Sequence, residues 1–415
     1  MFELGSEYMS WSFTANEQYN EIWRTQYKNV TILDSGTRYI INRNGIMNCF
    51  NYYDNKRICK NIQIIKTYND GTKSIIYDAV NFKDIDRDCD LFPDVDYFDV
   101  DDHENTYIAR VTKKFENYEN IYKTRVIEKN VDVLLINSKG EINWTYKLPD
   151  NSRIVNVIAF NNKVFVYTCE DLKLFLWIFD IEGVLLEKRI EKIYEQEYDI
   201  GGRKLQCSPG VLFKKIKGFV YIVAGDYIRI YDCNGNLKQS CPNKVTEQPN
   251  VIREFKNSDE QGYYWWGWGE NLIKRISWAG ETMWEYPLYS PGEYLLGCSN
   301  DMVFILNKGQ GLPRKISVIE HGFVKKEVIT ENIPSKILTL PNDQIGMLFT
   351  IDHEDHSMTE TFVSFSSDLE PLKEYRFEEL IKYLEVYEDK LYGYMKLSAN
   401  KELKRGKKNI GFMLQ

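Results

Sequence analysis

Four aspartates alternate along one short segment and are the first candidates for binding chemistry. The segment reads Asp84-Ile-Asp86-Arg-Asp88-Cys-Asp90. Carboxylates at alternate positions supply the hard oxygen ligands that Ca²⁺ prefers. An EF-hand is excluded, because Cys89 stands where the turn glycine belongs and Val95 where the bidentate glutamate belongs. We expect a solvated acidic loop and no cofactor, with calcium as the alternative.

Aromatic side chains are concentrated in one run, Gly262-Tyr-Tyr-Trp-Trp-Gly-Trp-Gly-Glu270. Strand alternation places Tyr264, Trp266 and Trp268 on one side of this run. Such a set either packs inside the protein or forms an exposed platform for a sugar ring or for an apolar anchor of a partner. We treat the three residues as candidate binding residues beside the core alternative.

Histidine chemistry is limited, since the chain holds four histidines and only His353 and His356 lie close together. A loop that carries this HxxH spacing has no helix to align two imidazoles on zinc. Both are therefore candidates for contact with a partner. The sequence contains no GxSxG, HExxH, P-loop or GxGxxG motif, so it singles out no catalytic residue.

The elements that position these residues follow from a repeat. An apolar run, a tight turn and a second short strand recur, with the turn ending at Gly140, Gly183, Gly235, Gly280, Gly322 and, in degenerate form, Leu369. The spacing of 42 to 52 residues is typical of a four-stranded propeller blade. Glycine suits these turns because it adopts a positive φ without steric cost.

Two further strand candidates precede each turn, so the chain is predicted to be all-β, a single β-propeller over residues 1–415 with four-stranded antiparallel blades. We count eight blades, or seven if the repeat at 29–64 is misread. The last repeat ends at its third strand, Asn409 to Leu414, and a strand near the N-terminus, 21–27, would complete that blade. Closure of this kind removes exposed sheet edges.

Two repeats share the pattern G-E-x-x-W-x-Y, at Gly140 to Tyr146 and at Gly280 to Tyr286. This pattern resembles the turn and strand of the quinoprotein-like propeller superfamily. The resemblance implies eight blades and a tryptophan that packs between neighbouring blades, here Trp144 and Trp284, with Trp23 in a similar place. It also implies a quinone with calcium and export from the cell, neither of which the remaining residues indicate.

Long connections are predicted on one face of the disc only. The segments 65–94 and 191–209 lie between blades, and 113–130 lies between two strands of one blade. The A/B and C/D turns on the other face are tight. Long loops on a rigid scaffold are where binding usually resides.

The formal net charge is −8, so no basic field attracts nucleic acid or an anionic membrane. The N-terminus shows no signal-peptide pattern, and we expect a cytoplasmic protein; the abundance of Lys, Asn, Ile and Tyr indicates an AT-rich bacterial genome. We therefore predict a non-catalytic scaffold that binds a protein or other macromolecule through its long-loop face. The alternatives are a carbohydrate-active or quinone-dependent enzyme and a module that binds a glycan or small ligand.

Overall fold

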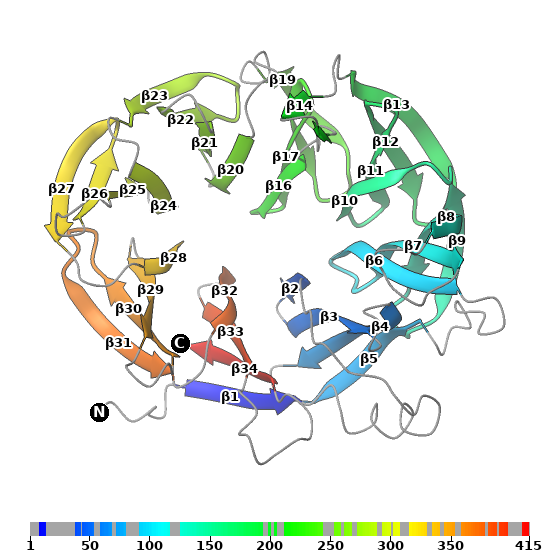
Figure 1. Ribbon diagram of the computed structural model, residues 1–415, viewed down its shortest axis with the longest axis horizontal. Helices are drawn as coiled ribbons and strands as arrows, with labels where there is room; N and C mark the ends of the chain where they lie inside the picture. Colours follow the sequence, from blue (N-terminus) through cyan, green and yellow to red (C-terminus); the bar gives the residue numbers. More distant parts are fainter. Residues whose placement is uncertain are drawn as a thin grey trace.

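The computed structural model contains eight four-stranded antiparallel sheets arranged around a ring (Figure 1). It describes residues 8–13, 38–42, 44–53, 59–68, 72–79, 91–116, 125–193, 198–200, 203–205, 211–243, 253–258, 261–267, 272–288, 293–299, 302–307, 315–329, 334–340, 344–352, 358–377, 381–387, 390–396 and 409–414. The predicted all-β propeller is confirmed. The blade count is eight, as predicted, and the first repeat is a true blade that begins at Arg38.

Each blade runs from an innermost strand A to an outermost strand D. Blade 1 is β2 (Arg38–Asn42), β3 (Gly45–Tyr53), β4 (Cys59–Tyr68) and β5 (Lys73–Asp78). Blade 2 is β6 (Leu91–Val100), β7 (Thr106–Glu116), β8 (Arg125–Ile136) and β9 (Ile142–Leu148). Blade 3 is β10 (Arg153–Ala159), β11 (Lys163–Glu170), β12 (Lys173–Asp180) and β13 (Leu185–Ile193). Blade 4 is β16 (Val211–Ile216), β17 (Phe219–Ala224), β18 (Tyr227–Asp232) and β19 (Leu237–Pro242).

The second half of the ring repeats this order. Blade 5 is β20 (Arg253–Ser258), β21 (Gly262–Gly267), β22 (Leu272–Ser277) and β23 (Thr282–Pro287). Blade 6 is β24 (Glu293–Ser299), β25 (Met302–Asn307), β26 (Lys315–Glu320) and β27 (Phe323–Ile329). Blade 7 is β28 (Pro334–Thr339), β29 (Ile345–Asp352), β30 (Met358–Phe365) and β31 (Pro371–Phe377). Blade 8 is β32 (Ile381–Tyr387), β33 (Lys390–Lys396), β34 (Asn409–Leu414) and β1 (Tyr8–Phe13).

The ring is closed by β1, which pairs antiparallel with β34 from Tyr8 opposite Leu414 to Phe13 opposite Asn409. Closure by an N-terminal strand is thus confirmed, but the strand that performs it was predicted wrongly. Tyr8–Phe13 takes this place rather than 21–27, a segment that lies outside the described residues together with Trp23. Each segment carries aromatic residues at an even spacing, Trp11 and Phe13 in one and Trp23 and Tyr27 in the other, so the pattern alone does not distinguish them.

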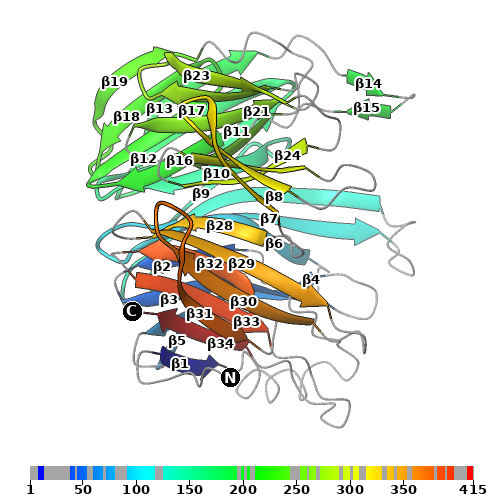
Figure 2. The same ribbon diagram turned by 90° about the vertical axis from the view of Figure 1, so that its left-hand side faces the viewer.

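The predicted long connections are shorter than expected. The segment 65–94 is not one insertion, because it contains the end of β4 and all of β5. The segment 113–130 is mostly strand, since β7 extends to Glu116 and β8 starts at Arg125. The segment 191–209 carries a separate hairpin of β14 (Tyr198–Ile200) and β15 (Arg203–Leu205). Figure 2 shows this hairpin and the long strands of blade 2 projecting to the same side.

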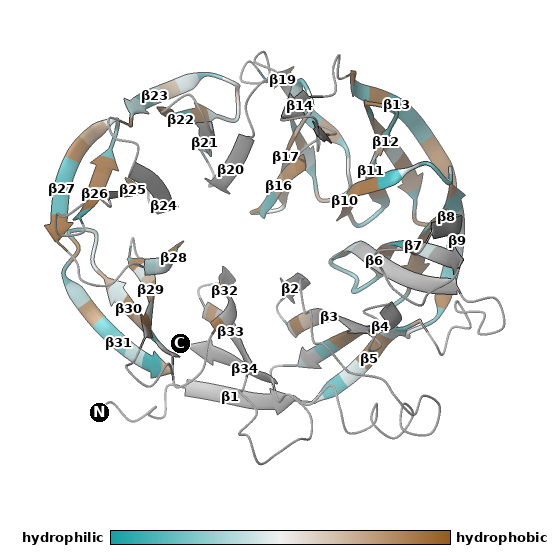
Figure 3. Ribbon diagram, viewed as in Figure 1, coloured by the Kyte–Doolittle hydropathy of each residue, from teal (hydrophilic) through white to brown (hydrophobic). Residues whose placement is uncertain are grey.

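The core lies between the blades. Each of seven buried clusters combines side chains from two neighbouring blades, from the pair 1 and 2 to the pair 7 and 8. Blades 2 to 7 therefore contribute apolar side chains to clusters on both sides. Figure 3 shows brown segments on inner and outer strands alike. Among the described residues there is no helix long and apolar enough to cross a membrane.

Every C/D strand pair of blades 1 to 7 also contains a one-residue shift in register near its turn. Such a β-bulge leaves one residue of the outer strand unpaired and turns the residues around it. In blade 2, β8 pairs with Ile142 and then with Trp144, so Asn143 is left unpaired directly before the tryptophan. In blade 5, β22 pairs with Thr282 and then with Trp284 in the same way.

Deleting residues 1–13 is expected to lower the free energy of unfolding by roughly 3 to 6 kcal/mol, because the ladder between β1 and β34 contributes about 1 kcal/mol for each hydrogen bond. The measurement is urea denaturation followed by tryptophan fluorescence. Deleting residues 1–7 is the matched control, since Tyr8–Phe13 remains. The chain that lacks residues 1–13 should also self-associate, as measured by sedimentation, because the edge of β34 becomes exposed. Equal stability of both deletions would show that β1 does not close the ring.

Candidate functional site

Trp144 of blade 2 packs against blade 3 as the sequence predicted. Its indole Nε1 donates a hydrogen bond of 2.8 Å to the carbonyl of Ile181, and its ring lies 6.0 Å from that of Phe179. The C/D turn of blade 3 approaches so closely that a Cβ on Gly183 would lie 2.6 Å from the indole. Trp144 is therefore a blade-packing residue, with its side chain partly buried against blade 3.

Trp284 occupies the same place between blades 5 and 6. It packs against the buried cluster that contains Val303 and Ile305 of blade 6, and its ring lies 5.8 Å from that of Tyr264. The two repeats that share G-E-x-x-W-x-Y thus build the same contact twice. The blade-packing role predicted for Trp144 and Trp284 agrees with this geometry.

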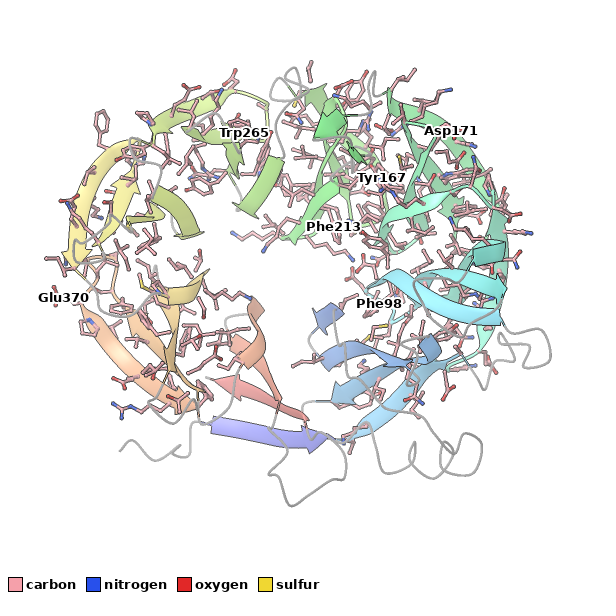
Figure 4. All side chains as sticks on the ribbon, viewed as in Figure 1. Phe98, Tyr167, Asp171, Phe213, Trp265 and Glu370 are labelled. Carbon is pink, nitrogen blue, oxygen red and sulfur yellow. The ribbon has the colours of Figure 1, made fainter. Side chains whose placement is uncertain are left out.

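The aromatic run forms strand β21, as expected, but its described side chains lie inside the protein. Tyr264 is only 2% exposed and belongs to the cluster shared with blade 6. Trp265, labelled in Figure 4, belongs to the cluster shared with blade 4. The proposal of Tyr264 as a binding residue is therefore wrong, because both faces of this blade are needed for packing. The side chains of Trp266 and Trp268 lie outside the described residues.

The remaining sequence candidates lie outside the residues that the structure describes. His353 and His356 lie outside the described residues, and so do Asp84, Asp86, Asp88 and Asp90. Within the described ranges, no group of three His, Cys, Asp or Glu side chains is placed to hold a metal ion.

On the face that carries the A/B and C/D turns, several of the described turns are capped by their own side chains. In the turn of blade 4, Asp232 Oδ1 accepts hydrogen bonds from the backbone N–H groups of Asn234 and Asn236, at 3.0 and 2.9 Å. Although desolvation acts to raise it, these bonds and Lys238 lower the pKa of Asp232 to about 2. Asn137 and Ser366 cap the corresponding turns of blades 2 and 7 in the same way. These turns are fixed, and their polar side chains are occupied.

A buried ion pair joins blades 3 and 4 near the outer rim. The fully buried carboxylate of Glu191 accepts a hydrogen bond of 2.6 Å from Arg189 Nε and a second bond from Arg229. Burial acts to lower the pKa of Arg189, but the bond to Glu191 outweighs it and raises that pKa above its usual range. A buried carboxylate with two guanidinium partners is a structural ion pair that joins the two blades.

The inner strands are joined by a contact that the sequence did not reveal. Lys215 of blade 4 reaches past blade 3 to Asp99 of blade 2, with 2.7 Å between Nζ and Oδ2. The same Oδ2 accepts a hydrogen bond of 2.7 Å from the backbone N–H of Ala159 in blade 3. Lys215 also donates to the carbonyl of Val100 at 3.1 Å. Phe213, labelled in Figure 4, lies on the same strand β16, two residues before Lys215.

The opposite face is built differently. There β7 and β8 run for 11 and 12 residues, longer than the strands of the other blades, and pair from Thr106 opposite Ile136 to Glu116 opposite Arg125. The β14–β15 hairpin stands between blades 3 and 4 and pairs with no blade. We call this side, defined by the projecting ends of β6, β7 and β8 and by the hairpin, the long-loop face (Figure 2).

Comparison with protein families finds no matching family model, and comparison with curated proteins finds no matching relative. Among solved structures, the chain is similar to BamB from Moraxella catarrhalis, with 12% identity, 93% of this chain and 98% of that chain covered, and a TM-score of 0.48. It is also similar to the β-propeller domain of the Trilobed protease from Pyrococcus furiosus, with 10% identity, coverage of 91% and 94%, and a TM-score of 0.38. The WD40 domain from Toxoplasma gondii coronin shares 8% identity over 62% of this chain and 80% of that chain, with a TM-score of 0.33. The fold described above rests on the strand pairing of this chain itself, and its relation to the quinoprotein-like superfamily stays a prediction.

Gly183→Ala is expected to destabilise the protein by about 2 to 4 kcal/mol, which combines the strain of a positive φ with displacement of Trp144. Gly140→Ala is the matched control, because Gly140 has nearly the same φ, +83° against +81°, and a Cβ added there would meet no atom within 4 Å. The control should lose about 1 to 2 kcal/mol. Equal losses in chemical denaturation would mean that the contact with Trp144 is unimportant.

Asp99→Ala is expected to lower the free energy of unfolding by roughly 2 to 4 kcal/mol, because it leaves Lys215 and the N–H of Ala159 without their shared acceptor. Lys214→Ala, at the exposed neighbouring position, should change stability by less than about 0.5 kcal/mol. Denaturation of both variants under the same conditions tests this. A neutral Asp99→Ala would show that the inner contact adds nothing to stability.

Proposed function

We propose that this propeller is a non-catalytic scaffold that binds a partner protein through its long-loop face. The observation that carries the proposal is the difference between its two faces. On one face the described turns are short, and the C/D turns of blades 2, 3, 4 and 7 are capped by their own side chains. On the other, blade 2 and the β14–β15 hairpin extend the surface beyond the disc (Figure 2). Segments that extend beyond the blades, and so add little to the packing between them, are the segments that usually contact a partner.

The hairpin is the clearest of these elements. Its two strands pair only with one another, from Tyr198 opposite Leu205 to Ile200 opposite Arg203. A two-stranded hairpin is marginally stable by itself in water. It therefore contributes little to the fold, and we assign it to recognition.

The partner is proposed to be a protein because the chain carries a net charge of −8, which disfavours binding to the phosphate backbone of nucleic acids. The glycan-binding alternative depended on an aromatic platform at Tyr264, Trp266 and Trp268. Tyr264 is buried, so the described part of that platform does not exist.

The experiment compares the intact protein with a variant in which residues 198–205 are replaced by a short Gly-Ser connection. Both are used as bait in extracts of the source cells, and the recovered partner is then purified and its affinity measured directly. We expect the variant to melt at the same temperature as the intact protein and to lose at least about tenfold in affinity.

The control is Lys139→Ala, in an exposed C/D turn on the opposite face, which should bind as the intact protein does. Recovery of partners that all bind the hairpin variant as tightly as the intact protein would contradict the proposal. Catalytic turnover of a small substrate by the purified chain would contradict its non-catalytic part.

A further inference from the structure

The most exposed large hydrophobic side chain among the described residues is Phe323, at 77%. It follows the two-residue turn of His321 and Gly322, whose φ angles of 50° and 82° are both left-handed. The turn connects β26 to β27 on the face opposite the long-loop face. An aromatic ring that is held in water by a fixed turn needs an explanation, because its burial would be favourable by about 2 to 3 kcal/mol.

Phe323 does not stand alone. Gly322 packs against blade 5, where a Cβ on it would lie 3.2 Å from the carbonyl of Glu285. On the other side of β27, Lys326 Nζ donates a hydrogen bond of 2.8 Å to the carbonyl of Asp368 in blade 7. The turn of blade 6 therefore lies against the middle of β23, and the turn of blade 7 lies against the middle of β27. Figure 4 shows Glu370 at the same rim, between β27 and β31.

Each of these strands contributes an exposed apolar residue near its turn. Met283 of β23 is 48% exposed, Val324 of β27 is 49% exposed and Leu372 of β31 is 49% exposed. Met283 and Leu372 are the bulge residues of their strands, so they have no cross-strand partner. We call Met283, Phe323, Val324 and Leu372 the rim patch. In Figure 3 the start of β27 is correspondingly brown.

Carboxylates surround the rim patch: Glu281, Glu285, Glu320, Asp368 and Glu370. Three lysines pair with three of them, Lys274 with Glu285 at 3.5 Å, Lys325 with Glu320 at 3.1 Å and Lys326 with Glu370 at 3.8 Å. Within the described part of the chain, no ion pair joins Glu281 or Asp368 to a cation. A fourth lysine, Lys373, lies next to Leu372, so the five carboxylates exceed the neighbouring lysines by one, and the border of the patch carries a small excess of negative charge.

We propose that the rim patch docks an apolar segment of a partner protein that carries lysine or arginine residues beside its apolar anchors. An apolar centre with an anionic border is complementary to such a segment. A second copy of this chain is a poor occupant, because it would bring the same carboxylates against one another. Strand addition along β27 is also disfavoured, since the bulge at Lys325 and the two lysines protect that edge.

This surface lies on the face opposite the proposed partner site. It does not depend on the hairpin or on blade 2, so the two proposals can fail separately. If both hold, the ring joins two partners through opposite faces.

The test uses a fluorescein-labelled amphipathic peptide of leucine and lysine, with fluorescence anisotropy as the readout. Phe323→Ser is expected to weaken binding at least about tenfold. Ile329→Ser is the matched control, because Ile329 lies at the other end of β27 and is 70% exposed. Both side chains are exposed, so neither variant should change the melting temperature, and the control should bind like the intact protein.

The charge component is tested with Glu281→Gln combined with Asp368→Asn, which should weaken binding of the lysine peptide about threefold or more at low salt. A peptide with glutamate in place of lysine should not bind. Equal loss in Phe323→Ser and Ile329→Ser, or equal binding of both peptides, would overturn the proposal.

Two further measurements separate the alternatives. A sedimenting dimer of the intact chain that Phe323→Ser converts to a monomer would assign the patch to a second copy and overturn the proposal. The variant that lacks residues 198–205 should bind the lysine peptide normally; loss of binding there would place the peptide on the long-loop face and equally overturn it.

Discussion

Apolar contact between neighbouring blades is the interaction on which this structure depends. A four-stranded sheet with both faces apolar cannot bury them alone, so each blade is stable only between two others. Trp144 and Trp284 show the consequence in detail, because each belongs to one blade by sequence and packs into the next by contact. A ring of such contacts has no free end once β1 completes blade 8. The N-terminal strand is therefore as necessary as any core residue.

The same constraint governs the polar groups. A charge enclosed between blades must be paired, and Glu191 is held by two arginines from adjacent blades. The backbone N–H and C=O groups on the inner edges of the A strands also need hydrogen-bond partners where the blades converge. Asp99 supplies one, since a single carboxylate oxygen joins the N–H of Ala159 to Lys215. The Glu191 contact thus joins two blades near the outer rim, and the Asp99 contact joins three blades at the inner strands.

Repeat spacing, turn glycines and the two G-E-x-x-W-x-Y segments were enough to predict the fold, since each is local and periodic. The site was harder to predict, because its residues are defined by neighbouring blades. Tyr264 alternates in β21 as an exposed residue would, and only the approach of blade 6 shows that it is buried. Asp99 and Lys215 lie far apart in sequence, and neither has a distinctive motif. The segment 113–130 was mistaken for a loop because its lysines and glutamates break the apolar pattern, although they continue strands beyond the disc.

The bulge near each C/D turn connects the core to the surface. By removing one residue from the ladder, it turns Trp144 and Trp284 toward the next blade and leaves the residue before each of them unpaired. That unpaired position is Asn143 in blade 2 but Met283 in blade 5 and Leu372 in blade 7. The bulge thus recurs in blades 1 to 7, whereas the residue that it leaves unpaired differs from blade to blade. The apolar residues at those positions on blades 5 and 7, like Phe323 on blade 6, lie on the surface. We expect a role other than folding, namely contact with a partner, to determine which residues stand there.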